Sequence, residues 1–180
     1  MNPDDLLQFW FHPERQAHWF KSTPELDRDI GARFGALWQR GRDGELGHWE
    51  ATPEGALALV ILLDQFPLNM FRGRAEGFAT EASSQAVAAR AIERGFDQAL
   101  DDRGKAFLYM PFMHSETMAD QERSLALLAA AGLDANLKWA RHHRDIVRRF
   151  GRFPHRNAIL GRQDTPEEKE WLASPEAFRG

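Results

Sequence analysis

The chain has 180 residues, is 43% apolar and carries a formal net charge of −4 at pH 7. A single domain spanning residues 1–180, with a full hydrophobic core, is therefore expected. The acidic total argues against a nucleic-acid partner, because nucleic-acid-binding domains are usually basic. The chain contains no cysteine, which excludes disulfides, thiol catalysis and cysteine-ligated zinc.

The N-terminal stretch MNPDDLLQFWF has acids where a signal peptide has basic residues, so no export signal is predicted. The longest apolar run, ALALVILL at 56–63, is far shorter than the roughly 20 residues that cross a bilayer. These features predict a cytoplasmic protein without membrane contact. No motif indicates a cofactor.

The predicted elements, taken in chain order, are all helices. Four start signals, each a threonine or serine followed by Pro-Glu, offer a cap, a proline for the first helical position and an acid that complements the helix dipole. They stand at 23–25, 52–54, 165–167 and 174–176. Apolar spacing and glycine stops predict helices over residues 2 to about 12, 23–41, 52–66, 81–94, 102–113, 117–131, 135–150 and a short stretch after 165.

Two prolines are expected to interrupt this pattern. Pro67 is expected to end the helix over 52–66, and Pro111 to kink or end the helix over 102–113. No convincing strand alternation is present. The prediction is an all-α fold of seven to eight or more helices, stacked as antiparallel helical hairpins.

A carboxylate at the end of the most apolar helix is the first candidate functional group. Asp64 follows Ile61 by three residues and therefore lies on an apolar face. A buried carboxylate is costly unless it is paired, so an arginine partner is expected. Pinning of a neighbouring loop and a direct ligand or catalytic role both remain open. Gln65, Asn69 and Arg72 follow as candidate ligand-binding residues.

The second candidate is a histidine close to carboxylates. His114 and Glu116 follow the Pro111 helix, and Asp120 comes shortly after them. An imidazole held by a carboxylate is a candidate general base, because it titrates near neutrality. A histidine that only hydrogen-bonds the carbonyls of a helix end is the alternative.

The third candidate lies in the helix over 135–150. His143 falls on a stripe with Trp139 and Ile146 and is expected to face the core. A buried structural role is favoured over metal ligation, and no metal site is predicted. Asp145 faces outward, where neighbouring arginines are expected to form surface ion pairs with it.

Positive charge is concentrated near the C-terminus. Seven arginines and one acid lie between residues 141 and 162, so this segment is +6 and the rest of the chain −10. Within it, RFGRFPHRN at 149–157 carries two phenylalanines that are expected to anchor the loop by burial. An anchored loop that presents guanidinium, imidazole and amide groups is a candidate anion receptor. Its candidate ligand-binding residues, with one earlier in the helix, are Arg144, Arg149, Arg152, Arg156 and Asn157.

These segments resemble a known family. LDQFPLNMFRG (63–73), YMPFMHSE (109–116), ADQERS (119–124) and HRDIVRRFGRFPHRNAILGR (143–162) are similar to the bacterial domain of unknown function 924, over nearly the whole chain. The resemblance implies a single tetratricopeptide-repeat-like helical domain and carries no established activity. The signature residues that it implies are Asp64, Gln65, Asn69, Arg72, His114, Glu116, Gln121, His143, Arg144, Arg149, Arg152, His155, Arg156 and Asn157. Leu68 departs from the basic residue that the resemblance implies after Pro67.

Three functions remain open. The leading hypothesis is a binding protein whose arginine- and histidine-lined pocket takes a small anionic molecule or the acidic end of a peptide. The second is a hydrolase or lyase with His114 or His155 as general base, Glu116 beside it, and Arg152 or Arg156 stabilising developing charge. The third is a scaffold for a protein partner. The arginines also have an internal alternative, in which they neutralise Asp64, Glu116 or Asp120.

Overall fold

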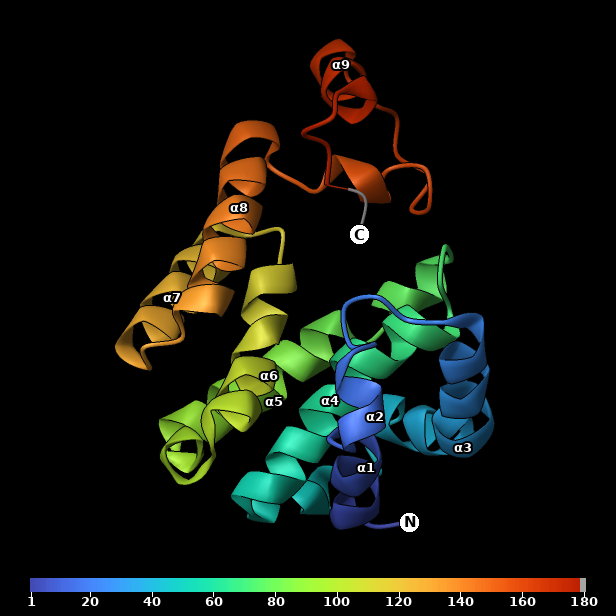
Figure 1. Ribbon diagram of the computed structural model, residues 1–180, viewed down its shortest axis with the longest axis vertical. Helices are drawn as coiled ribbons and strands as arrows, with labels where there is room; N and C mark the ends of the chain where they lie inside the picture. Colours follow the sequence, from blue (N-terminus) through green and yellow to red (C-terminus); the bar gives the residue numbers. More distant parts are fainter. Residues whose placement is uncertain (179–180) are drawn as a thin grey trace. The chain divides into compact units, whose positions relative to one another are not determined.

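A computed structural model describes residues 1–178, and every regular element among them is helical (Figure 1). The α-helices are α1 (Pro3–Trp10), α2 (Pro13–Gln16), α3 (Pro24–Arg42), α4 (Pro53–Met70), α5 (Glu81–Glu93), α6 (Asp102–His114), α7 (Met118–Ala130), α8 (Asp134–Phe150) and α9 (Pro166–Ala173). Short 3-10 helices lie in the connections: η1 (Gly47–Ala51), η2 (Ala75–Phe78), η3 (Phe96–Ala99) and η4 (Pro154–Arg156). The predicted all-α class is confirmed.

Three of the four predicted start signals begin helices. The hydroxyls of Thr23, Thr52 and Thr165 each accept a backbone N–H in the first turn of α3, α4 and α9. The fourth signal, at Ser174, does not begin a helix among the described residues. The Ser174 hydroxyl donates to the carbonyl of Trp171 at 2.7 Å, so it satisfies the C-terminal end of α9 and does not cap a new helix.

The predicted end of a helix at Pro67 is also wrong. Helix α4 continues through Pro67 to Met70, and α6 continues through Pro111 to His114. Each proline removes one backbone donor and crowds the preceding turn. Both helices persist because they are buried over most of their length, and burial in tertiary packing outweighs the local cost.

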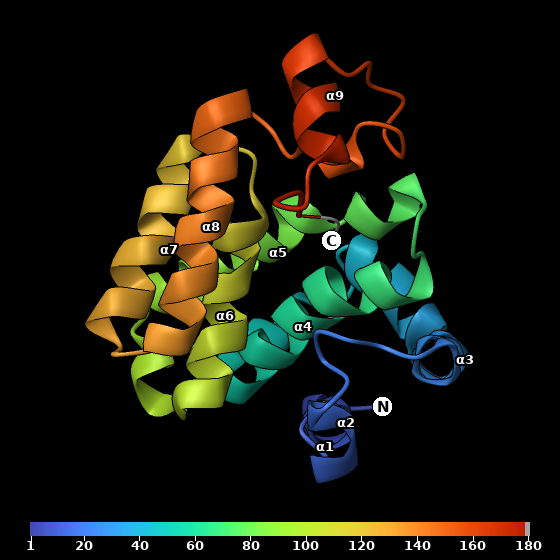
Figure 2. The ribbon, with the colours of Figure 1, turned by 45° about the horizontal axis from the view of Figure 1, so that its top comes forward.

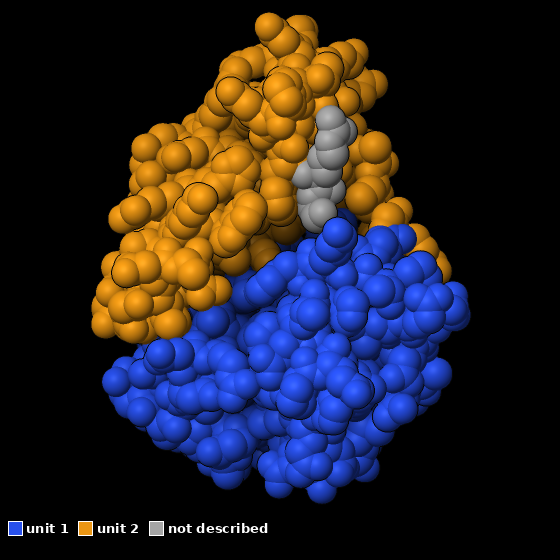
Figure 3. All heavy atoms as spheres, viewed as in Figure 1, with its two compact units in different colours: residues 1–72, 76–111 blue, residues 73–75, 112–180 orange. Residues whose placement is uncertain are grey.

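The chain divides into two units, coloured separately in Figure 3. Unit 1 contains residues 1–72 and 76–111, and unit 2 contains residues 73–75 and the described chain from 112 onward. The expectation of a single domain over 1–180 stays a prediction.

In unit 1, α4 is the central helix. Its residues from Gly55 to Pro67 are all buried, as its lack of a polar face predicts. Helices α1, α3 and α5 and the short helix η1 pack against it. The approach of η1 is so close that a Cβ on Gly55 would collide with the carbonyl oxygen of Trp49. Only glycine fits at this position.

In unit 2, α7 and α8 lie side by side (Figure 2). Gly151 ends α8 in a left-handed conformation with φ of 71°, as its sequence position predicts. The chain then forms η4 and α9, which contact each other. A small core joins these elements and contains Ile146, Val147, Phe153 and Trp171.

One residue predicted for the apolar stripe of α8 lies outside it. Trp139 is 55% exposed, whereas His143 is only 7% exposed and faces the core as predicted. The buried stripe begins at Leu137 and Ala140, so Trp139 lies between its rows and points toward solvent.

Candidate functional site

The loop after α8 is anchored in unit 2 by a buried ring and by an ion pair. The Phe153 side chain is fully buried, which confirms the predicted anchoring. Its backbone N–H donates to Glu116 Oε1 at 2.7 Å. Arg162 donates to both oxygens of Glu116, at 2.6 and 2.9 Å, and to the carbonyl of Phe153 at 3.2 Å. Glu116 therefore ties together segments that are far apart in the sequence.

The surroundings of Glu116 favour its charged form. Burial alone raises the pKa of this carboxyl, but the hydrogen bonds from Arg162 and from the Phe153 amide lower the pKa overall. The arginine that neutralises Glu116 is thus Arg162, which sequence reasoning counted among the basic residues but did not select. No local pattern distinguishes it from the six other arginines of the segment.

Arg152 and Asn157 belong to a second polar network. Arg152 forms a forked pair with Glu168, with distances of 2.7 and 2.8 Å from Nε and Nη2. Glu168 is 1% exposed, and Arg152 lowers its pKa to about 2. Asn157 donates to Asp164 at 2.8 Å and accepts from Arg162 at 2.9 Å. These two candidate ligand-binding residues therefore hold α9 and the loop after η4.

Three histidines gather where α6, α8 and η4 meet. The His143 and His114 rings lie 6.5 Å apart between centroids. His143 Nδ1 lies 2.9 Å from the carbonyl of Trp139 and must be the donor there, because a carbonyl only accepts. Burial lowers the pKa of His143 to about 3. The ring is therefore neutral at pH 7, and its Nε2 is an acceptor.

His155 is the most unusual of the three. Its Nδ1 is buried, and no hydrogen-bond partner reaches it from residues 1–178. Burial, followed by the positive charge of Arg156, lowers the pKa of His155 to about 4. A buried nitrogen without a partner is costly in a folded protein and marks a position where a ligand atom fits.

Arg156 supplies a permanent positive charge beside these rings. Its side chain is only 6% exposed, and its guanidinium lies 4.7 Å from the centroid of the Phe153 ring. Its Nη2 donates to the carbonyl of His114 at 3.0 Å. We call His114, His143, His155, Phe153 and Arg156 the histidine cluster. It brings His114 and His143 together with His155 and Arg156 of the loop predicted to be an anion receptor.

Two candidate arginines of α8 form ion pairs, Arg144 from a half-buried position and Arg149 from an exposed one. Arg144 pairs with Asp145 at 2.7 Å, and Arg149 pairs with Glu167 at 2.8 Å. Asp145 also lies 3.8 Å from Arg148, so the predicted surface pairing of Asp145 is confirmed. The pairs in which both side chains are more than half exposed, Arg148–Asp145 and Arg149–Glu167, contribute about 0–1 kcal/mol each to stability.

The remaining candidates lie in unit 1. Asp64 is buried as predicted, and the Gln65 side chain donates to it at 2.5 Å. Asn69 donates to Asp27 at 2.8 Å, and Arg72 forms a forked contact with the same carboxylate at 2.9 and 3.2 Å. Burial raises the pKa of Asp27, but hydrogen bonds that include those from Arg72 and Asn69 lower the pKa overall. Asp27 is the common partner here, and the α3 pattern did not reveal it.

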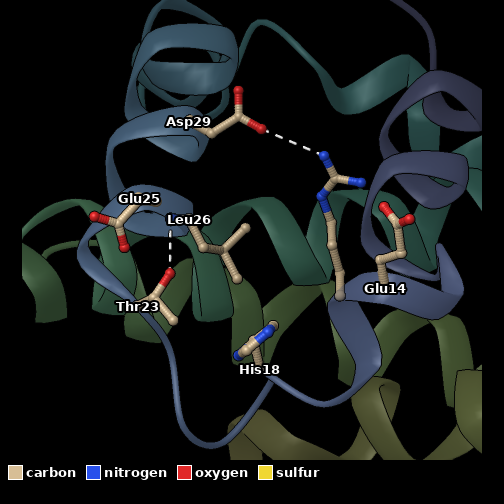
Figure 4. A pocket seen from close by; sticks show the side chains of 7 residues that line it. Glu14, His18, Thr23, Glu25, Leu26 and Asp29 are labelled. Carbon is tan, nitrogen blue, oxygen red and sulfur yellow. Dashed lines mark hydrogen bonds and ion pairs between the residues drawn. The ribbon is translucent and has the colours of Figure 1, made fainter.

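Unit 1 also contains an open hollow of about 390 Å³ (Figure 4). It is lined by Glu14, Arg15, His18, Thr23, Glu25, Leu26 and Asp29. Its one arginine, Arg15, is 3.3 Å from Asp29, so the lining has excess negative charge. None of the candidate site residues lines it, and its charge does not suit an anion.

Within residues 1–178, no group of three or more histidine, aspartate or glutamate side chains is placed to hold a metal ion. Over the same part of the chain, no helix combines the length and apolar character needed to cross a membrane.

Comparison with known proteins gives a family and a fold. The family model described as a bacterial protein of unknown function (DUF924) matches residues 6–176. A solved structure of a protein of unknown function from Agrobacterium tumefaciens is 42% identical, with a TM-score of 0.89, over 95% of this chain and 96% of that chain. No curated protein matches the chain. The family resemblance is confirmed, while the tetratricopeptide-like description stays a prediction.

Proposed function

The chain belongs to the bacterial family DUF924, and we propose that its histidine cluster binds a small carboxylate or the acidic end of a peptide. The observation that carries the proposal is the buried Nδ1 of His155, which has no hydrogen-bond partner within residues 1–178. A ligand oxygen at this position accepts a hydrogen bond when Nδ1 carries the proton.

The charge of the cluster favours an anion. Arg156 carries a positive charge and is nearly removed from water, so its field acts in a region of low dielectric constant. The neighbouring imidazoles of His143 and His155 are neutral at pH 7, because burial lowers the pKa of each. Glu116, the nearby carboxylate, is already matched by Arg162. A carboxylate ligand therefore meets no unmatched negative charge among these groups.

Neutral histidines also give the cluster a mixed hydrogen-bonding character. His143 Nε2 is an acceptor, because Nδ1 is committed to the carbonyl of Trp139. His155 Nδ1 is available as a donor in one tautomer. A ligand with a carboxylate and a neighbouring hydroxyl or amide N–H satisfies both nitrogens. The acidic end of a peptide has this pair of groups.

A thermal-shift assay with matched ligands tests the proposal. Acetate, succinate and N-acetylaspartate are compared with acetamide and succinamide, which have the same shape but no charge. A ligand at a concentration of 100 times its Kd stabilises the folded protein by about 2.7 kcal/mol. This raises Tm by roughly 5–10 °C in a chain of this size.

Two histidine variants locate the effect. His155→Leu removes the ring nitrogens and is expected to abolish the shift caused by carboxylates. His48→Leu makes the same change at an exposed position of η1 and is expected to leave the shift unchanged. Equal shifts with carboxylates and amides, or a full shift in His155→Leu, contradict the proposal.

A second candidate function is a hydrolase or lyase, favoured by the neutral state of His155. A general base must be unprotonated, and a pKa of about 4 keeps this imidazole so at neutral pH. The rate of such an enzyme rises as the pH increases through about 4 and is then constant. Screening ester, amide and hydroxy-acid substrates with wild type and His155→Leu tests this function. A rate that His155→Leu retains excludes His155 as the base.

A further inference from the structure

The histidine cluster is covered by an aromatic ring from the C-terminal segment. After α9 the chain returns toward η4 (Figure 1). There the half-buried Phe178 ring lies 4.6 Å from His143 and 5.0 Å from His155 between centroids. A third imidazole, that of His142, lies 5.9 Å away.

The side chains around the Phe178 ring, His142, His143, His155 and Phe153, form what we call its seat. The geometry of this seat is specific for an aromatic ring. The planes of the three imidazoles are inclined to the Phe178 ring by 64°, 83° and 74°. Edge-to-face contacts at such separations place positive ring edges against negative ring faces, which aliphatic side chains do not reproduce. The Phe153 ring adds a further wall, 5.5 Å from His143 and 5.7 Å from His155.

We infer that Phe178 is a tethered occupant of an aromatic subsite, and that the ligand of the histidine cluster is a carboxylate with an aromatic ring that displaces it. The inference rests on the proposed function for its carboxylate part. The seat lies against His155, whose Nδ1 donates to the carboxylate, and against His143, whose Nε2 accepts from the neighbouring hydroxyl or amide N–H, so one ligand can occupy both positions. Arg156, next to His155, provides the matching cation.

The tether makes Phe178 an effective competitor. Only the residues after Ala173 separate it from α9, and Ala177 packs with it against the core of unit 2. A short tether gives an effective concentration on the order of millimolar without any external ligand. If the Phe178 ring occupies its seat roughly nine-tenths of the time, a competing ligand binds about tenfold more weakly than it would bind to the same site without the ring.

The seat is tested first without any ligand. Diethyl pyrocarbonate acylates neutral imidazoles, and peptide mass spectrometry gives the rate at each histidine. Phe178→Ala is expected to raise the rates at His143 and His155 about tenfold. Phe178→Leu, which keeps most of the apolar volume, is expected to raise them less. Phe20→Ala removes a phenylalanine that is 73% exposed in unit 1 and is expected to leave both rates unchanged.

The ligand class is then tested by calorimetric titration with phenylacetate, N-acetylphenylalanine and acetate. Phe178→Ala is expected to bind the two aromatic acids about tenfold more tightly than wild type, with no comparable gain for acetate. An equal gain for acetate overturns the aromatic subsite.

The outcomes separate this inference from the proposed function. Histidine rates that Phe178→Ala leaves unchanged overturn the tethered occupant, even if carboxylates bind to wild type. Raised acylation rates at His143 and His155, with no carboxylate bound by wild type or by Phe178→Ala, support the claim that Phe178 occupies the seat. That second result overturns the proposed function and the ligand class together.

Discussion

Replacement of Glu116 tests how firmly the loop that contains the cluster is held. The carboxylate accepts three hydrogen bonds, two from Arg162 at 2.6 and 2.9 Å and one from the Phe153 amide at 2.7 Å. Glu116→Ala removes all three and leaves the guanidinium without its counter-charge. Glu116→Gln keeps an oxygen for the amide but removes the charge.

The expected cost follows from burial. Breaking a fully buried ion pair destabilises a protein by about 3–5 kcal/mol. The side chains of Glu116 and Arg162 are 25% and 24% exposed, so water recovers part of that cost. We expect Glu116→Ala to lower the free energy of unfolding by about 2–3 kcal/mol, and Glu116→Gln by about 1–1.5 kcal/mol.

Urea unfolding followed by tryptophan fluorescence measures these differences at pH 7. The matched control is Glu122→Gln, because Glu122 is 52% exposed and pairs with Arg148 at 3.4 Å. Its expected cost is below about 0.5 kcal/mol. The pKa of Glu116 is lowered in the folded protein, so its contribution is complete above the ordinary value of 4.5 and is lost as the pH falls through the lowered value.

A small effect would refute the reasoning. If Glu116→Ala costs no more than Glu122→Gln, hydration of Arg162 replaces the ion pair and the loop does not depend on it. If the difference between wild type and Glu116→Gln does not shrink as the pH falls below 4.5, the ion pair is not the source of the cost.

Three further substitutions have defined outcomes. Gly55→Ala normally stabilises a helix, but here the added Cβ meets the carbonyl of Trp49, so thermal unfolding is expected to show a loss of about 1–3 kcal/mol. The pKa of Glu168 is lowered in the folded protein, so the stability that its charge contributes rises between about pH 2 and 4.5 and is complete above 4.5. Glu168→Gln is expected to flatten this rise in a pH series of unfolding measurements. An unchanged pH profile contradicts this. Trp171 is 7% exposed and Trp139 is 55% exposed. In urea unfolding, Trp171→Ala is therefore expected to lower the free energy of unfolding by about 3–5 kcal/mol, and Trp139→Ala to change it by no more than about 0.5 kcal/mol. Similar losses in the two variants contradict the assigned burial.

The helices were predictable because their signals are local. A threonine cap such as Thr52, a proline at the first helical position and a terminal glycine such as Gly151 act through hydrogen bonds within a few residues. Pro67 was misjudged because its effect depends on the burial of the whole of α4, which a local pattern does not contain. Ser174 was misjudged because its hydroxyl turns back to the preceding helix.

The site was predictable in its residue types and not in its pairings. The inward position of His143 follows from helical spacing, and the burial of Phe153 follows from the short aromatic loop. The partner of Glu116 is Arg162, 46 residues away, and spacing cannot select it from seven similar arginines. Phe178 has no periodic pattern around it, so its seat among the imidazoles is known only from tertiary structure.

The central claim is that a carboxylate ligand reaches the unpartnered nitrogen of His155. Nitrogen NMR of protein labelled in the histidine rings observes this atom directly during titration with N-acetylphenylalanine at pH 7. We predict a saturable shift of the His155 Nδ1 signal that is absent with the corresponding amide. A His155 signal that stays constant while another part of the protein binds the acid would contradict it.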